Sequence, residues 1–153
     1  MKGLTKLAAL AALSVVTAVS FAGDLKWETD ANKAMALSKK TGKPILADFT
    51  GSDWCGWCIR LHKEVFDTPS FAKWASSKVI LLELDYPQSK PQSAELKKQN
   101  AGLAQKYKIE GYPTILFLNA SGKVLGQYGY DSGGPSKWIP NAEKLIAGKK
   151  IEQ

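Results

Sequence analysis

The sequence is poor in the residue types from which metal centres and nucleic-acid interfaces are built. Its 153 residues include two cysteines, one histidine and two methionines, so a four-ligand zinc site would need help from a carboxylate. Arg60 is the only arginine, and the rest of the positive charge behind the net +7 comes from lysines scattered along the chain. Nucleic-acid sites favour clustered, forked guanidinium groups, so these lysines indicate solvated basic surfaces and no nucleic-acid partner.

The sequence also lacks an internal apolar run long enough to cross a bilayer. Its longest apolar stretch, 7–19, follows Lys2 and Lys6 and is short for a membrane span. Ser20-Phe21-Ala22 comes next, with small residues at the two positions that a signal peptidase reads. A basic start, a short apolar core and small residues at the end are typical of a secretory signal peptide. We therefore predict a signal peptide over 1–22, cleaved after Ala22. A retained anchor is the alternative, which the length disfavours.

The remaining chain, 23–153, has the composition of one globular domain. Hydrophobic residues make up 44% of the sequence and charged residues 23%, as in ordinary folded proteins. A domain of this size buries enough apolar surface to fold without disulfide staples. Since a signal peptide directs export, we expect a periplasmic or secreted protein whose mature chain does not insert into the membrane, in a compartment where disulfides persist.

Apolar patterning predicts that helices alternate with strands. Helical patterns cover 28–43, 55–65, 69–77, 94–108 and the end of 133–150, and strand patterns cover 44–50, 78–85, 113–119 and 123–130. Thr29 or Asp30 can cap the first helix, and Gly42 can end it. The polar segment 86–93 carries two prolines and is predicted to be a solvated loop. This order of elements predicts an α/β layer architecture with a mixed central sheet.

The two cysteines, Cys55 and Cys58, stand two residues apart in the stretch GSDWCGWCIR. A zinc site would have only these two and His62 as ligands, one short of the usual four. Covalent haem attachment requires histidine directly after the second cysteine, where this chain has Ile59. A structural disulfide across so small a loop removes little entropy from the unfolded chain. A redox role fits the pair better than any of these.

The position of the pair at the start of a predicted helix favours redox chemistry. The N-terminal amides and dipole of a helix stabilise an anion, and therefore the thiolate of Cys55. Cys58 lies one turn further in, less exposed and close enough to attack a mixed disulfide formed at Cys55. Gly56 lets a partner chain approach. Trp54 and Trp57 offer flat apolar contact surface, with ordinary core packing as the alternative. We favour contact surface for Trp57 and a core or rim position for Trp54.

Two stretches, ILADFTGSDWCGWC and KIEGYPTILFLNASGKVLGQYGY, together resemble the thioredoxin superfamily. The resemblance runs from about Trp27 to Ile146 and is greatest to secreted bacterial thioredoxin-like proteins with a WCGWC motif. It implies a thioredoxin fold, in which helices flank both faces of a central mixed sheet. It also implies a thiol–disulfide oxidoreductase that exchanges disulfides with protein substrates and needs no bound cofactor or metal.

The resemblance assigns roles to five residues. Cys55 matches the attacking cysteine and Cys58 the resolving one, so the two form the redox-active disulfide. Asp48 matches a buried acid that shuttles a proton to or from the resolving cysteine through water. Pro113 matches a cis-proline that faces the cysteines. The backbone of Tyr112 is thereby turned outward, where a substrate strand can pair with it.

Three features depart from the family pattern. Trp57 between the cysteines brings neither the rigidity of proline nor the charge of histidine, so the direction of electron flow stays open. Many thioredoxins pair the buried acid with a lysine, but the matching position here is Leu81. Without that partner, burial should raise the pKa of Asp48 and keep it protonated near neutral pH. The longer segment 86–100 is interpreted as a solvated loop with a helix extension. His62, four residues beyond Cys58, is interpreted as a half-exposed surface residue, with tuning of Cys58 as the alternative.

Two functions from different classes remain. The first is a secreted oxidoreductase that receives electrons from a redox partner protein, which we expect to be bound to the membrane. The second is a non-enzymatic binding module on the same fold, which docks a partner or handles copper through its two thiolates.

Overall fold

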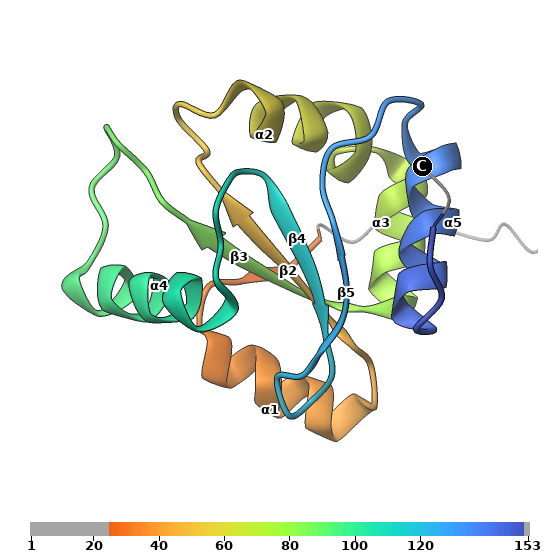
Figure 1. The fold of residues 1–153 in the computed structure, drawn as a ribbon, viewed down its shortest axis with the longest axis horizontal. Coiled ribbons are helices and arrows are strands. Elements are labelled where there is room, and N and C mark those ends of the chain that lie inside the picture. Colours follow the sequence, from red (N-terminus) through yellow and green to blue (C-terminus); the bar gives the residue numbers. More distant parts are fainter. Residues whose placement is uncertain (1–24, 152–153) are drawn as a thin grey trace, which may run out of the picture.

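The computed structural model describes residues 25–151, and the predicted signal peptide, 1–22, lies outside them. A five-stranded sheet occupies the centre, with strands in the order β1-β3-β2-β4-β5 (Figure 1). The strands are β1 (Trp27–Glu28), β2 (Ile45–Thr50), β3 (Ile80–Asp85), β4 (Thr114–Leu118) and β5 (Val124–Tyr128). β1, β3 and β2 run parallel, whereas β4 and β5 join antiparallel, so the sheet is mixed as predicted.

Helices cover both faces of the sheet, which confirms the predicted thioredoxin fold. They are α1 (Ala31–Thr41), α2 (Gly56–Leu61), α3 (Pro69–Lys78), α4 (Ala94–Tyr107) and α5 (Pro135–Ile146), with a π-helical turn, η1 (His62–Phe66), directly after α2. Figure 1 shows α1 and α4 on one face and α2, α3 and α5 on the other. Among the helices of residues 25–151, none is both long and apolar enough to cross a bilayer.

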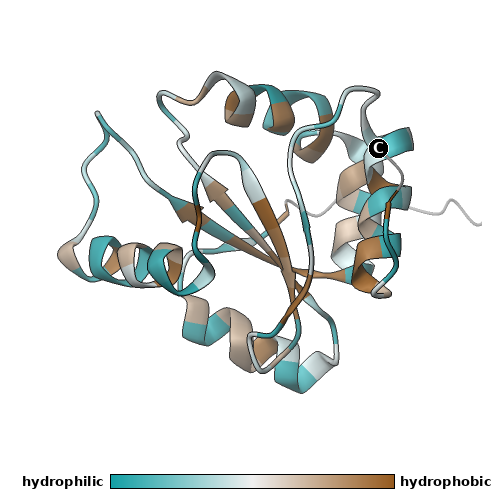
Figure 2. Cartoon of the chain, viewed as in Figure 1, coloured by the Kyte–Doolittle hydropathy of each residue, from teal (hydrophilic) through white to brown (hydrophobic). Residues whose placement is uncertain are grey.

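The alternation of side chains along β2 divides the core into two clusters. Leu46 packs with apolar residues of α2, η1, α3 and α5, among them the fully buried Trp138. Ile45, Ala47 and Phe49 pack into the second cluster, toward α1 and α4. All six residues of β2 are buried, and the sheet forms the apolar centre of the molecule in Figure 2. Asp48 and Thr50 share the face of Leu46, so a carboxyl and a hydroxyl lie beneath α2.

The ends of α1 follow the predicted capping chemistry. The amides of Asn32 and Lys33 donate to the side chain of Asp30, which makes Asp30 rather than Thr29 the cap. Gly42 ends the helix at a φ of 73°, a left-handed conformation that suits glycine, and its amide donates to the carbonyl of Ser38.

Two elements were not predicted. β1 has only two residues, too few to show an alternating pattern, and pairs with β3 at the edge of the sheet. The second is η1, where the amide of Asp67 donates to the carbonyl of His62, five residues earlier, at 2.8 Å. Such widened turns occur frequently at functional sites.

Candidate active site

The two cysteines are joined as a disulfide at the N-terminus of α2. Cys55 is the capping residue of the helix, and its Sγ accepts a hydrogen bond from the amide of Cys58 at 3.2 Å. The two Cα atoms lie 5.2 Å apart. Cys55 is 6% exposed and Cys58 1%, so the sulfur that the sequence assigns to attack lies nearer to solvent. This end of a helix favours a thiolate once the disulfide is reduced.

Asp48 lies on β2 beneath the cysteine helix and is fully buried. Its Oδ2 lies 2.8 Å from Nε2 of His62, while its Oδ1 has no hydrogen-bond partner among the described residues. Burial raises the pKa of Asp48, as the sequence predicted, and the hydrogen bond to His62 opposes the shift without cancelling it. The hydroxyl of Thr50, two residues along the same strand face, is likewise buried without a described partner.

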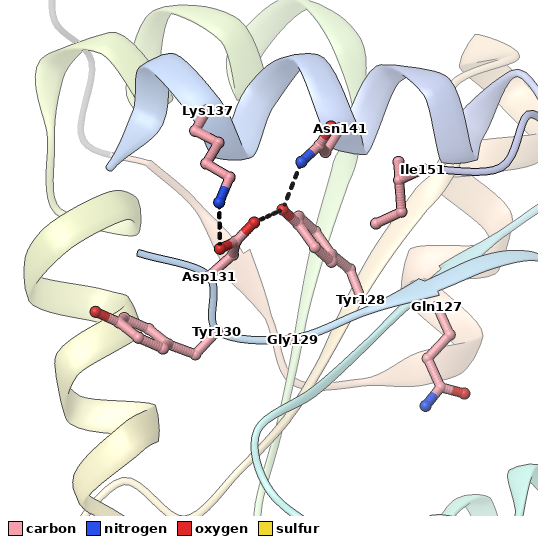
Figure 3. Close-up of a pocket in the computed structure, with 8 residues that line it drawn as sticks. All are labelled: Gln127, Tyr128, Gly129, Tyr130, Asp131, Lys137, Asn141 and Ile151. Carbon is pink, nitrogen blue, oxygen red and sulfur yellow. Dashed lines mark hydrogen bonds and ion pairs between the residues drawn. The ribbon is translucent and has the colours of Figure 1, made fainter. Parts of the chain in front are cut away.

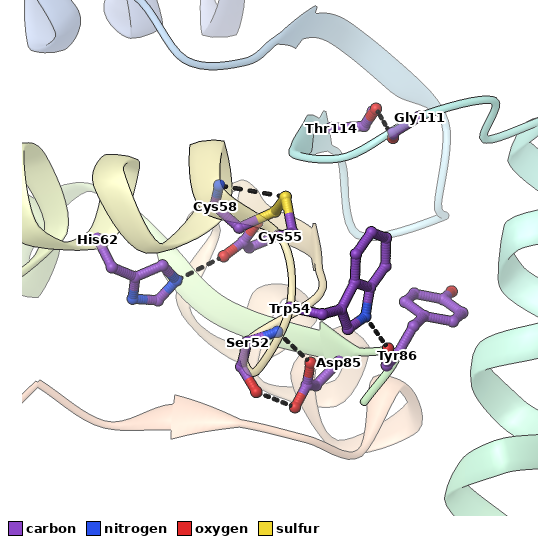
Figure 4. The surroundings of a disulfide bond; sticks show 10 residues. Ser52, Trp54, Cys55, Cys58, His62, Asp85, Tyr86, Gly111 and Thr114 are labelled. Atoms are coloured by element: carbon purple, nitrogen blue, oxygen red, sulfur yellow. Dashed lines mark hydrogen bonds and ion pairs between the residues drawn. A yellow bond between two sulfur atoms is a disulfide. The ribbon is translucent and has the colours of Figure 1, made fainter. Parts of the chain in front are cut away.

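His62 is partly exposed, as predicted, but the premise that Asp48 lacks a partner was wrong. The side chain of His62 is 26% exposed, and its Nε2 bonds to the buried carboxyl of Asp48; Figure 4 shows the ring directed toward the side of the cysteine pair. The sheet register places Leu81 beside Leu46, whereas Glu83 lies beside Asp48. The partner of the acid therefore comes from the helix above and not from the neighbouring strand. The spacing of Cys58 and His62, one helical turn apart, was the sequence signal for it.

The peptide bond between Tyr112 and Pro113 is cis, as expected. It immediately precedes β4, whose first residue, Thr114, pairs with Phe49 near the end of β2. The hydroxyl of Thr114 donates to the carbonyl of Gly111 at 2.7 Å and closes the turn. Figure 4 places Gly111 and Thr114 across the disulfide from His62, so the cis-proline turn lies next to the cysteines.

Exposed apolar side chains flank the disulfide. Trp57 is 56% exposed, Ile59 50% and Trp54 41%, which excludes core packing for the two tryptophans. The ring of Trp54 packs edge-on against Tyr112 at 5.7 Å, and that of Trp57 lies 5.1 Å from Tyr130. The cysteines therefore lie between two aromatic pairs, one beside the cis-proline turn and one beside the segment after β5.

The only arginine of the chain belongs to the second pair. The guanidinium of Arg60 lies 5.6 Å from the ring of Trp57 and 5.4 Å from that of Tyr130. Its Nε donates to Glu64 at 2.6 Å, and the hydroxyl of Tyr130 donates to the other oxygen of the same carboxylate at 2.7 Å. These contacts hold Trp57 and Arg60 in place beside the disulfide without burying them.

The loop 86–93 is exposed over 88–91, as predicted, and is also hydrogen-bonded to the cysteine loop. The carboxylate of Asp53 accepts hydrogen bonds from the amides of Gln88, Ser89 and Lys90 at 3.0, 2.7 and 3.0 Å. These bonds lower the pKa of Asp53. The indole of Trp54 donates to the carbonyl of Tyr86 at 2.8 Å. The loop thus supports the Trp54 side of the site.

We predict that Asp53→Ala frees this loop. Three amides lose their acceptor, so their hydrogen exchange should become at least about tenfold faster. Amide exchange at residues 88–90, read by NMR, measures the effect. Asp30→Ala is the matched control, because it removes a carboxylate that caps α1 and should affect only residues 32–33. Unchanged exchange at 88–90 in Asp53→Ala would contradict the tethering.

A hollow of about 500 Å³ lies between β5 and α5 and contains neither cysteine (Figure 3). Its polar groups bond to one another. Nζ of Lys137 donates to Asp131 at 2.8 Å, the hydroxyl of Tyr128 donates to the same carboxylate at 2.8 Å, and Asn141 donates to that hydroxyl. Burial raises the pKa of Tyr128 to about 12, so it stays neutral. Because the Asp131 carboxylate, the Tyr128 hydroxyl and the Lys137 ammonium are already paired with one another or with Asn141, this hollow is not a candidate for chemistry.

Known proteins match both the sequence and the fold. The Thioredoxin-like domain family model matches residues 31–134. Disulfide bond reductase DsbH of Chlamydia pneumoniae is 34% identical over 82% of this chain and 75% of its own length. Thioredoxin-related protein DsbJ of the same organism is 33% identical, but the chain spans only 32% of it.

A solved structure of the DsbH oxidoreductase, 30% identical, superimposes with a TM-score of 0.80 over 90% of this chain and 95% of that one. Residues 31–134, which the family model matches, include the cysteine helix, the cis-proline turn and the buried Asp48. The chain belongs to the thioredoxin-like family, as a thiol–disulfide oxidoreductase of the Dsb kind.

Proposed function

We propose that this thiol–disulfide oxidoreductase works as a reductase of protein disulfides in the periplasm. The observation that carries the proposal is the Cys55–Cys58 disulfide at the start of α2, with a cis-proline turn on one side and a buried acid beneath. The reducing direction is supported by the similarity to a relative named as a disulfide bond reductase, three quarters of which the chain covers. Export rests on the signal peptide predicted over 1–22.

The first step is attack by the reduced protein on a substrate disulfide. The thiolate of Cys55 bonds to one substrate sulfur, the substrate S–S bond breaks, and the other substrate sulfur leaves as a thiolate that takes a proton from water. Gly56, next to the attacking sulfur, is exposed, and apart from its chain neighbours and its own helix backbone no described atom lies within 4 Å of where its Cβ would be. A substrate chain can therefore approach Cys55 from this side.

The second step is resolution of the mixed disulfide by Cys58. The Cys58 thiol gives its proton toward Asp48, its sulfur bonds to Sγ of Cys55, and the remaining substrate sulfur leaves as a thiolate. The net change oxidises two protein thiols to a disulfide and reduces one substrate disulfide to two thiols. We assign Asp48 the role of proton acceptor because it is the buried carboxyl beneath the cysteine helix.

Substrate contacts surround the pair. Trp54 and Trp57 supply apolar surface on either side, and the backbone of Tyr112 before Pro113 is available to a substrate strand. The aromatic rings are well suited to protein substrates because they bind without a requirement for one side-chain type. The partners of this site are thus proteins that carry disulfides or thiols.

Regeneration of the dithiol requires electrons from another protein. The periplasm is kept oxidising, so no pool of small thiols there maintains a reductase. We propose a membrane-bound redox partner with two thiols. One partner thiolate attacks Cys55, and Cys58 leaves and regains a proton from Asp48. The second partner thiol then attacks the partner sulfur of this mixed disulfide, so that Cys55 leaves as a thiolate and the partner is oxidised to a disulfide. All steps are exchanges between sulfurs and need no bound cofactor.

Equilibration with glutathione tests the direction. We expect the cysteine pair to be more reducing than glutathione, so that it stays a disulfide in mixtures where glutathione itself is mostly reduced. Alkylation followed by mass spectrometry gives the fraction reduced at each ratio. A pair that stays reduced in the presence of excess glutathione disulfide would instead indicate an oxidant or isomerase.

The copper-handling alternative is tested in the same preparation. Residues 25–151 contain no group of three or more His, Cys, Asp or Glu side chains that could hold a metal ion, so copper would rest on the cysteines alone. Titration of the reduced protein with Cu(I), beside an insulin-reduction assay, separates the two functions. Tight binding with no insulin reduction would favour the binding module.

A further inference from the structure

The carboxyl of Asp48, the buried acid of the site, is connected to solvent through the side chain of His62. Asp48 is fully buried, and the only described hydrogen bond of its carboxyl runs from Oδ2 to Nε2 of His62 at 2.8 Å. The His62 side chain is 26% exposed. The other carboxyl oxygen, Oδ1, is buried with no described partner. The imidazole of His62, which is partly exposed, therefore bonds one oxygen of the carboxyl, while the other oxygen makes no described hydrogen bond.

The helix places this ring next to the resolving cysteine. Cys58 and His62 are four residues apart across the junction of α2 and η1, and side chains at this spacing are neighbours, about 5–6 Å apart at Cβ. Aromatic rings fix the orientation of the imidazole: Trp27 lies 5.8 Å away and Phe66 5.0 Å away. The widened turn after His62, closed by the amide of Asp67, sets the ring over the strand that carries Asp48.

We infer that His62 is a positioning residue for resolution: it holds Asp48 through Nε2, leaves Oδ1 free to exchange a proton with the Cys58 thiol, and carries the compensating charge. This inference rests on the proposed function. No role for His62 follows from the family pattern quoted above, because there the partner of the acid is a lysine on the neighbouring strand.

The charges around His62 favour its cationic form. Asp48 faces it from β2, Glu83 from β3 and Asp67 from the end of η1, while Asp85 lies further along β3. Burial alone would lower the pKa of His62, but the hydrogen bond and charge of Asp48 outweigh it and raise that pKa, with smaller contributions from Glu83 and Asp67.

The positive groups nearby are lysines. Lys63 follows His62 on its own element and is exposed, and Lys90 acts on Glu83 from the loop. Neither makes a described ion pair with Asp48 or His62. Among the described residues, the acid and the imidazole are therefore each other's principal counter-charge.

The proton balance of resolution follows from this pair. The step starts from the form in which Asp48 is ionised, His62 is protonated and Cys58 is a thiol. The Cys58 proton moves to Oδ1, its sulfur bonds to Cys55, and the substrate sulfur leaves as a thiolate. With the carboxyl neutral, His62 loses its counter-charge and releases one proton to water, which the departing thiolate can take up. When the disulfide is reduced again, these transfers reverse.

The test separates the two chemical steps with one small disulfide, dithiobis(nitrobenzoate). Attack by Cys55 releases the first nitrothiolate, and resolution by Cys58 releases the second, so stopped-flow absorbance gives both rates. We compare the wild type with His62→Gln, which keeps an N–H donor for Asp48 but cannot titrate. Lys63→Gln is the control, since it removes a charge from the next position.

In His62→Gln we expect the first phase within about twofold of wild type and the second at least about tenfold slower at neutral pH. We also expect its rate–pH profile to lose one titration, which a merely structural role would not cause. A second phase that matches wild type at every pH would overturn the inference. Absence of the first phase in the wild type would instead overturn the proposed function.

The lone histidine provides a measurement that does not depend on the folding of this variant. Because His62 is the only imidazole in the chain, its NMR signals are assigned without ambiguity. Its pKa should lie above the ordinary value in the wild type and fall in Asp48→Asn. An unchanged pKa of His62 in Asp48→Asn would show that the two groups are not coupled and would overturn the inference.

Discussion

Cys55→Ser is expected to reduce insulin reduction to the uncatalysed rate, the largest loss of activity that any single substitution in this chain should cause. The serine hydroxyl is not ionised near neutral pH, and the helix N-terminus cannot make it so. The turbidity of insulin with dithiothreitol as electron source measures the loss. Full turnover by Cys55→Ser would exclude the mechanism, because no other thiol of the chain lies as near to solvent.

Cys58→Ser is the informative companion to this variant. Cys55 can still attack, but no second sulfur resolves the product, so a mixed disulfide with the substrate should accumulate. Non-reducing electrophoresis and mass spectrometry detect it, and dithiothreitol should release it. The double variant, with both cysteines replaced, is the control for non-specific capture. Trapping by Cys55→Ser but not by Cys58→Ser would reverse the assigned roles of the two sulfurs.

The parts of this site that could be predicted depend on neighbours in the sequence. The cysteine spacing, the helix start at Cys55 and the apolar run of β2 are local signals, and the structure confirms all three. The burial of Asp48 could be predicted because it stands inside that run. The cis bond before Pro113 was predicted from the family resemblance, because the local sequence does not determine whether this bond is cis or trans.

The parts that were missed depend on contacts between elements far apart in the chain. Asp53 binds amides 35 to 37 residues away, and His62 bonds a carboxyl 14 residues away on another element. Matching Leu81 to a family lysine assumed that the partner of the acid must come from β3. The register of the sheet places Glu83 there instead, and a second acid cannot serve as the counter-charge. The widened turn at η1, which orients His62, has no distinctive sequence pattern.

Asp48→Asn is expected to slow resolution of the mixed disulfide by about 100-fold while leaving the first attack nearly unchanged. The amide is close to the carboxyl in size and can still accept a hydrogen bond from His62, but it cannot take the Cys58 proton. The second phase of nitrothiolate release measures the effect. Glu110→Gln, which neutralises an exposed carboxyl, should leave both phases as in the wild type. A normal second phase in Asp48→Asn would remove the carboxyl from the mechanism.

The same substitution should stabilise the folded protein, by an amount that depends on pH. Because burial raises the pKa of Asp48, the folded state binds its proton more tightly than the unfolded chain. The free energy of unfolding therefore falls as pH rises from about 4, the ordinary value for aspartate, through the raised pKa. The pKa of His62 is also raised in the folded state. The contribution of His62 to the free energy of unfolding is therefore fully present below the ordinary pKa of histidine, and it is lost as the pH rises through the raised pKa.

Asp48→Asn removes the loss of stability that comes from ionising Asp48, and it weakens the loss that comes from deprotonating His62. Its advantage over the wild type should be small near pH 4 and grow to about 1–3 kcal/mol in neutral to alkaline solution. Urea unfolding of the oxidised proteins at a series of pH values gives the difference. Parallel pH profiles for the two proteins would mean that the buried carboxyl is ionised at no cost to the fold. The pKa of Asp48 would then not be raised in the folded state, and the carboxylate would not be a strong enough base to take the proton of Cys58.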